Sequence, residues 1–219
     1  MDGLSLKVWR STTSFISACK CSPWRPAPLF TGAEAYHFLL LCQRQLYAGY
    51  PADAMKTAMR LREYEQVLPP AEIYSLIALT AFYSKYYAQC SKAFVRLQSM
   101  SNLPPHKKEA IDKLALSIFS KIAERGGGPT DPATRKQPPC HQCGAVVKDY
   151  DGRCGSCGTQ FPACIFSGRS ILDMTEAASC KSCKRRYLVH EVGTKQNCAL
   201  CHHPLPNATK ASKPVGNLS

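Results

Sequence analysis

Eight cysteines, arranged as four Cys-x-x-Cys pairs, are the residues of this sequence with the clearest chemistry. Two residues between cysteines let one tight turn present both sulfur atoms to the same ion, and a tetrahedral zinc ion takes four such ligands at about 2.3 Å. Ten residues separate the first two pairs and fourteen the last two, which are comfortable hairpin lengths. The spacing predicts two structural zinc ions. The expected ligands are Cys140, Cys143, Cys154, Cys157, Cys180, Cys183, Cys198 and Cys201.

Disulfides and a redox-active pair are the alternatives to zinc. The chain has 13 cysteines, but Lys7 and Arg10 interrupt the apolar residues near its start, so no secretory signal is recognisable and a disulfide framework is disfavoured. Nothing around the pairs resembles the βαβ unit of thioredoxin-like redox proteins. Two ligand arrangements stay open: consecutive pairs share an ion, which is simplest, or a cross-brace interleaves the pairs. A closed four-thiolate site has no open position for water or substrate, so we expect no enzyme.

Cys164, between the second and third pairs, is a candidate additional ligand for the second site. That site needs only four ligands, however, and the four cysteines of the last two pairs already supply them. We therefore favour the interpretation of Cys164 as a small buried apolar residue.

A basic cluster beside the third pair is a candidate contact patch for RNA or DNA, because phosphate groups are bound by such charges. It consists of Lys181, Lys184, Arg185 and Arg186. Basic residues beside zinc thiolates are also expected simply to balance the negative charge of the site. A nucleic-acid-binding zinc ribbon is therefore the alternative function, and nucleic acid is an unlikely partner.

The chain of 219 residues has a formal net charge of +13. Two four-thiolate zinc sites would each change this charge by −2, which leaves about +9. A basic chain permits contact with acidic proteins, RNA or anionic membranes and identifies none of them. Since no apolar run reaches the ~20 residues of a transmembrane helix, we expect the protein in the reducing cytosol.

Residues 31–124 have the periodicity of helices. Thr31 and Glu34 form a capping box, and later prolines suit the first turns of further helices. Apolar residues at i, i+3, i+4 and i+7 predict about five helices in all. At an offset of 36 residues Tyr47 and Tyr50 fall on Tyr83 and Tyr86, a repeat typical of TPR-like helical hairpins. A generic helical bundle is the alternative.

The expected fold is mainly α: a TPR-like α-solenoid fragment followed by a small module of β-strands and loops with two four-cysteine sites. The sequence divides into an unstructured leader at 1–30, TPR-like hairpins at 31–124, a flexible linker at 125–139, a double zinc-ribbon module at 140–205 and a disordered tail at 206–219. The linker and tail are assigned from composition.

Several segments resemble a known family. They are Gly32-Ala33-Glu34-Ala35-Tyr36-His37-Phe38, Gln43-Arg44-Gln45-Leu46-Tyr47, Glu72-Ile73-Tyr74-Ser75-Leu76 and Cys90-Ser91-Lys92-Ala93-Phe94, with Pro162 to Gly168 as a Pro-x-Cys-Ile-x-x-Gly segment between cysteine pairs. Together they are similar to the C-terminal region of the intraflagellar transport complex A subunit of the one-hundred-and-twenty-one type. The resemblance covers residues 32–205.

The resemblance implies a non-enzymatic scaffold. Members of the family carry two N-terminal WD-repeat propellers and a long TPR-like solenoid, and they support retrograde ciliary transport, cilium assembly and entry of membrane proteins into the cilium. The implied partners are other complex A subunits and, indirectly, ciliary cargo or adaptors, with no small-molecule substrate. The implied locations are the cytoplasm, the axoneme of the cilium or flagellum, and the basal body. The propellers are absent and residues 1–30 do not match, so the chain is either a fragment of such a subunit with a mispredicted start or a shortened relative, and we favour the fragment.

Overall fold

The computed structural model of the protein describes residues 31–124, 128, 130–132 and 139–206. It divides into two compact units, residues 1–133 and residues 134–219, which are described separately. The predicted leader at 1–30 lies outside the described residues, as do all of the predicted tail except residue 206 and most of the predicted linker.

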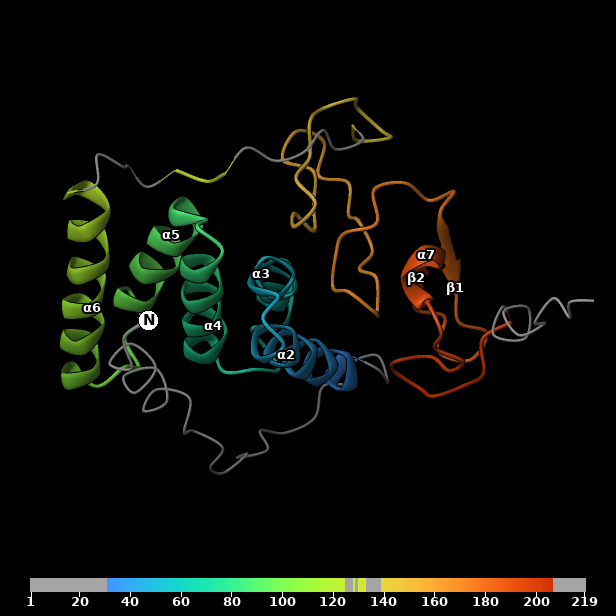
Figure 1. Ribbon diagram of the computed structural model, residues 1–219, viewed down its shortest axis with the longest axis horizontal. Coiled ribbons are helices and arrows are strands. Elements are labelled where there is room, and N and C mark those ends of the chain that lie inside the picture. Colours follow the sequence, from blue (N-terminus) through green and yellow to red (C-terminus); the bar gives the residue numbers. More distant parts are fainter. Residues whose placement is uncertain (1–30, 125–127, 129, 133–138, 207–219) are drawn as a thin grey trace, which may run out of the picture. The chain divides into compact units, whose positions relative to one another are not determined.

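The described residues of the first unit form a row of five α-helices, each packed on its neighbours in the chain (Figure 1). The helices are α2 (Thr31–Tyr47), α3 (Pro51–Arg60), α4 (Pro70–Tyr83), α5 (Tyr87–Gln98) and α6 (Pro105–Glu124), and the short 3-10 helix η1 (Leu61–Tyr64) continues α3. Proline at the first position of α3, α4 and α6 supplies a preset helical φ where no backbone N–H bond is lost. The prediction of TPR-like helical repeats is confirmed.

The two helical hairpins, α2–α3 and α4–α5, are copies of one another at the predicted offset of 36 residues. In the first loop the N–H of Tyr50 donates to the carbonyl of Gln45 at 2.9 Å, and in the second the N–H of Tyr86 donates to Ala81 at 2.8 Å. The residue before each tyrosine has a positive φ, 83° at Gly49 and 65° at Lys85. The same turn therefore reverses the chain in both hairpins.

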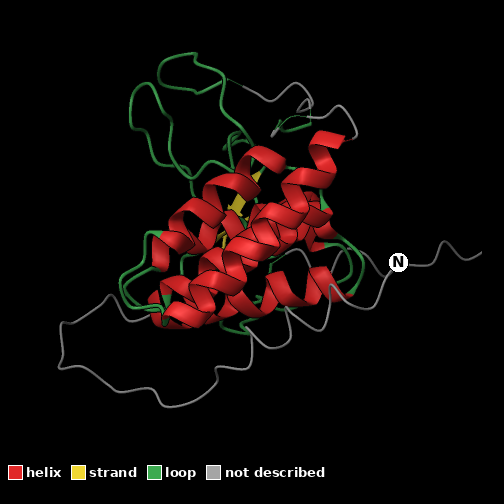
Figure 2. Cartoon of the chain, turned by 90° about the vertical axis from the view of Figure 1, so that its left-hand side faces the viewer, coloured by secondary structure: helices red, strands yellow, loops and turns green. Residues whose placement is uncertain are grey.

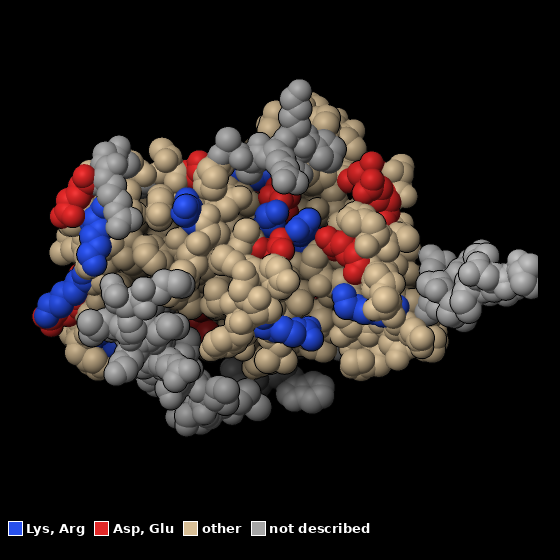
Figure 3. All heavy atoms as spheres, in the orientation of Figure 1, with Lys and Arg blue, Asp and Glu red and all other residues tan. Residues whose placement is uncertain are grey.

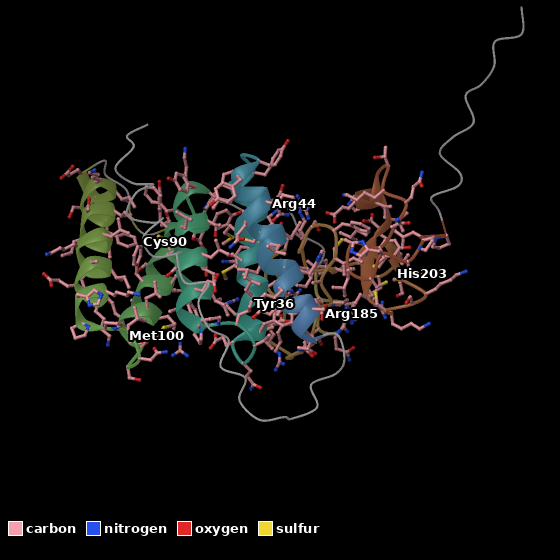
Figure 4. All side chains as sticks on the ribbon, turned by 90° about the horizontal axis from the view of Figure 1, so that it is seen from below. Tyr36, Arg44, Cys90, Met100, Arg185 and His203 are labelled. Atoms are coloured by element: carbon pink, nitrogen blue, oxygen red, sulfur yellow. The ribbon has the colours of Figure 1, made fainter. Side chains whose placement is uncertain are left out.

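The cores of the two hairpins repeat the same contact with the cysteine exchanged between helices. The thiol of Cys42 on α2 donates to the carbonyl of Ala54 on α3 at 3.2 Å. In the second hairpin the thiol of Cys90 on α5 donates to the carbonyl of Ala78 on α4 at 3.5 Å (Figure 4). All four residues are fully buried. Small side chains at this crossing let the paired helices approach closely.

The outer face of α2 carries exposed apolar side chains. Tyr36 is 49% exposed (Figure 4), Leu40 63% and Tyr47 82%. Ala35, Phe38 and Leu39 are buried instead. Only one face of a helix can pack against the core. The apolar residues of α2 occupy more than that face, so some of them are exposed.

Part of the predicted linker is tied to the first unit. The carboxylate of Asp131 accepts hydrogen bonds from the backbone N–H groups of Ala88 and Gln89 at 3.0 and 3.3 Å, and from the Gln89 side chain at 2.8 Å. The carbonyl of Thr130 accepts from the N–H of Tyr87 at 3.2 Å. These groups satisfy backbone donors at the start of α5, which no side chain of its own N-cap residue reaches.

The second unit is built largely of turns. Its described residues contain one two-stranded antiparallel sheet, β1 (Ala177–Ser179) with β2 (Arg186–Leu188), and one short helix, α7 (Val189–Val192) (Figure 1). Loops and turns, green in Figure 2, make up the rest of these residues. Isolated bridges between Arg153 and Gln160, Ala163 and Ser170, and Asn197 and Pro204 mark further short hairpins. Among the described residues, no helix is both long and apolar enough to cross a membrane.

Candidate metal centres

The eight predicted cysteines gather into two clusters of four. The first cluster contains Cys140, Cys143, Cys154 and Cys157, and the second contains Cys180, Cys183, Cys198 and Cys201; within each, the sulfur atoms all lie within 4.8 Å of one another. Consecutive pairs come together, so the interleaved cross-brace arrangement is not the one adopted.

The sulfur separations suit a tetrahedral ion. In the first cluster Cys140 and Cys157 have sulfur atoms 3.7 Å apart, and Cys143 and Cys154 3.6 Å. In the second the corresponding distances are 3.6 Å and 3.7 Å. Four sulfurs at about 2.3 Å from a central zinc would be about 3.8 Å apart. The clusters are thus compatible with two structural zinc ions, and the predicted cofactor is confirmed.

Each cysteine pair lies on the same kind of turn, here called a knuckle and named by its first cysteine. In the Cys140 knuckle the N–H of Cys140 donates to the carbonyl of Ala145 at 2.9 Å, and the N–H of Gly144 donates back to the carbonyl of Cys140 at 2.8 Å. The Cys154, Cys180 and Cys198 knuckles repeat both bonds at the same spacing, with lengths from 2.8 to 3.0 Å. These bonds hold both sulfurs of a pair on one side of the turn.

The residue after the second cysteine of each knuckle has a positive φ. It is glycine in the first cluster, with φ of 71° at Gly144 and 75° at Gly158, as expected for a chain that folds back around a metal. In the second cluster the same conformation is taken by Lys184 at 61° and His202 at 58°. The backbone requirement is common to all four knuckles, although the residue type is not.

The seventh residue after the first cysteine of each knuckle is apolar and buried. These residues are Val147, Phe161, Tyr187 and Leu205, none more than 4% exposed. The first two pack with Cys140 and Cys154, and the last two with Cys180 and Cys198. Each hairpin therefore contributes one metal-binding pair and one core side chain.

The two clusters differ in exposure. Cys143 and Cys157 of the first cluster are exposed, whereas three cysteines of the second cluster are buried and Cys201 is half-buried. Hydrogen bonds from the side chain and backbone of Thr159 lower the pKa of Cys157 to about 6. Burial is the main cause that raises the pKa of Cys183 to about 12. The thiols of the first cluster are thus the more accessible to solutes.

Cys164 does not join either cluster. It is fully buried, and its thiol donates to Oε2 of Glu191 at 2.8 Å while its sulfur accepts from the N–H of Leu188 at 3.3 Å. Burial, followed by the charge of Glu191, raises the pKa of this thiol. Cys164 packs in the core of the second cluster.

The basic cluster lies at the Cys180 knuckle and is mostly exposed. Lys181, Lys184 and Arg186 are exposed and Arg185 is half-buried (Figure 4). On the face shown in Figure 3, the Lys and Arg side chains of the described residues are interspersed with Asp and Glu. A field of one sign is what binding along a phosphate backbone needs.

Comparison with known proteins assigns both units. A family model described as IFT121-like TPR repeats matches residues 27–125, and one for the second zinc finger domain of IFT121 matches residues 162–206. The chain is 39% identical to WD repeat-containing protein 35 of Rattus norvegicus over 171 residues, and 37% identical to that of Homo sapiens over 174. These matches cover 78% and 80% of this chain but 13% of each relative. With its TPR repeats and its second zinc finger matched in order along the chain, this protein belongs to the IFT121 family.

Proposed function

We propose that the eight clustered cysteines are the ligands of the two zinc ions, and that these ions hold structure rather than catalyse a reaction. Support comes from sulfur separations that fit a tetrahedral ion and from four repeated knuckles. Four thiolates fill a zinc site and leave no position for water or substrate. Two such ions would each contribute on the order of 10 kcal/mol to folding, as in zinc-finger peptides.

We further propose that the chain acts as a non-enzymatic scaffold subunit of intraflagellar transport complex A. In this role it supports retrograde ciliary transport, cilium assembly and ciliary entry of membrane proteins, and it resides in the cytoplasm, the axoneme and the basal body. The observation that carries the proposal is the occurrence, in one chain, of the IFT121-like TPR repeats and the second zinc finger of IFT121. Its direct partners would be other complex A subunits, and cargo or adaptors would be reached through them.

The helical hairpins and the zinc module would present different kinds of surface to partners. Stacked helical hairpins present a regular side-chain surface, as in other repeat proteins. A module cross-linked by zinc presents a rigid surface, because the metal ions hold its knuckles in place. Rigid surfaces bind with a smaller loss of conformational entropy than mobile loops do.

The test is affinity purification of the tagged chain from ciliated cells, with bound proteins identified by mass spectrometry. We expect other complex A subunits in the wild-type sample. The variant Cys154→Ser/Cys157→Ser should lose one zinc ion and recover less of these subunits, while Ser156→Ala, between the same two cysteines, should keep both zinc ions. Recovery of no ciliary protein by the wild-type chain would contradict the proposal.

The same preparation tests the nucleic-acid alternative. Salt-dependent retention on RNA or DNA that falls when Lys181, Lys184 and Arg186 are replaced by alanine would favour that alternative. The exposure of these three side chains is the observation behind it.

A further inference from the structure

A fifth hairpin of the second unit has the backbone of a knuckle without a cysteine pair. The N–H of Cys164 donates to the carbonyl of Arg169 at 2.8 Å, and the N–H of Gly168 donates to the carbonyl of Cys164 at 2.8 Å. Gly168 has a φ of 76°, as at the equivalent position of the other knuckles. Ile171, seven residues after Cys164, is fully buried. Residues 164–168 therefore form a fifth knuckle, the Cys164 knuckle, with Ser167 at the position of the second cysteine.

The serine hydroxyl occupies the position of a sulfur atom. In each of the four cysteine knuckles, the backbone N–H two residues beyond the second cysteine bonds to its sulfur; these residues are Ala145, Thr159, Arg185 and His203. In the Cys164 knuckle the N–H of Arg169 donates to Oγ of Ser167 at 3.3 Å. The local hydrogen bonding is preserved although the ligand atom has changed.

A carboxylate from α7 contacts the first residue of this knuckle. Glu191 accepts the hydrogen bond of the Cys164 thiol through Oε2, and its Oε1 lies 3.8 Å from Nη1 of Arg169. Among the described residues, Cys164 and Glu191 belong to no group of three ligands that could hold an ion. Glu191 thus links the thiol of Cys164 to the guanidinium of Arg169.

The Cys164 knuckle also lies between the two clusters. On one side Ser170 bonds to the first-cluster loop, with its N–H 3.1 Å from the carbonyl of Asp149 and its hydroxyl 2.7 Å from that of Asp151. On the other side the N–H of Ile165 donates to the carbonyl of Arg186 on β2 at 3.1 Å.

The two residues that follow Ser170 continue this division. Ile171 packs in the core of the second cluster and Leu172 in the core of the first. Successive side chains of an extended segment point to opposite sides, so one short segment contributes to both cores.

We propose that the Cys164 knuckle is a metal-free copy of the zinc knuckle, and that its Cys164–Glu191–Arg169 cluster joins the two metal centres into one folded unit. This inference rests on the ligand assignment proposed above, but it does not depend on the scaffold function.

Zinc content tests the first half of the inference. The wild-type chain should hold two zinc ions, and Ser167→Cys should hold three, because Cys164, the new cysteine and Glu191 then supply three ligands and water can be the fourth. Ser182→Cys is the matched control, since Ser182 is an exposed serine inside the Cys180 knuckle but not at a ligand position; it should hold two. Three ions in the wild type, or two in Ser167→Cys, would overturn the proposal.

Hydrogen exchange of the zinc-loaded chain tests the second half independently. Glu191→Leu should keep two zinc ions yet speed amide exchange about tenfold or more on both sides of the joint, at Ile165 and at Ser170, because a buried charged hydrogen bond is lost. Glu191→Gln, which keeps an acceptor for the thiol, should have a smaller effect. Glu176→Leu removes an exposed carboxylate 3.7 Å from His190 and should leave both amides unchanged. Loss of one zinc ion from Glu191→Leu would make Glu191 a ligand, and faster exchange on one side only would exclude a joint; either result refutes the inference.

Discussion

Replacement of Asp131 by alanine is expected to destabilise the helical unit, although composition alone places this residue in a linker. Its Oδ1 accepts from two backbone N–H groups at the start of α5, and its Oδ2 accepts from the side chain of Gln89, which is 7% exposed. Loss of a side-chain cap costs about 1 kcal/mol, and an unsatisfied buried amide adds about 1 kcal/mol or more. Asp131→Ala should therefore lower the free energy of unfolding by about 2 kcal/mol.

The measurement is urea unfolding followed by circular dichroism at a helical wavelength, since the described helices longer than one turn all lie in the first unit. Asp131→Asn should have an intermediate effect, because its amide oxygen can still cap the helix without the charge that favours the N-terminal end. Asp112→Ala is the control, since its carboxylate accepts from Gln98 at an exposed position, and it should change stability by less than about 0.5 kcal/mol. Equal effects of Asp131→Ala and Asp112→Ala would refute the reasoning.

Three further predictions concern the second unit. A chelator should remove zinc from the first cluster before the second, because Cys143 and Cys157 are exposed. Mass spectrometry of alkylated cysteines would report the order of metal loss. Earlier alkylation of the second-cluster cysteines would contradict this prediction. Tyr187→Phe should leave stability unchanged or raise it by up to about 1 kcal/mol, because this buried hydroxyl has no hydrogen-bond partner among the described residues; a clear loss in thermal unfolding would argue against it. Lys184→Gly should stabilise the Cys180 knuckle by about 1 kcal/mol, because Lys184 has a φ of 61°; a lower unfolding midpoint would exclude this.

The metal clusters could be predicted from the sequence because their determinants are local. A Cys-x-x-Cys pair fixes two ligands on one turn whatever surrounds it, and the short hairpins between pairs leave few ways to combine them. The repeated helical hairpins were predictable for a similar reason. Tyr50 and Tyr86, at an offset of 36, mark the same turn, with the same backbone bonds.

The features that the sequence did not predict depend on contacts between distant residues, or on a helix face that has no neighbour. Asp131 caps a helix that begins more than forty positions earlier, and composition carries no signal of such a contact. The exposure of Tyr36 and Tyr47 depends on which face of α2 has a neighbour. The Cys164 knuckle does have a sequence signal: a cysteine, a glycine four residues later and an apolar residue seven residues later. A search for paired cysteines does not detect this pattern.

Position within a knuckle separates the residues that build the zinc module from those that are free to determine recognition. Folding fixes the cysteines, the positive-φ residue after them and the apolar residue at the seventh position. In three of the four cysteine pairs the two inner residues are exposed: His141 and Gln142, Gly155 and Ser156, and Lys181 and Ser182. Ala199 and Leu200 in the last pair are instead partly buried against the second core. With three-residue strands the module has little sheet to stabilise it, so its rigidity depends on the metal ions. Substitutions at these exposed positions can therefore change the module's surface without a cost in folding, and this is where we expect specificity for partner subunits to reside.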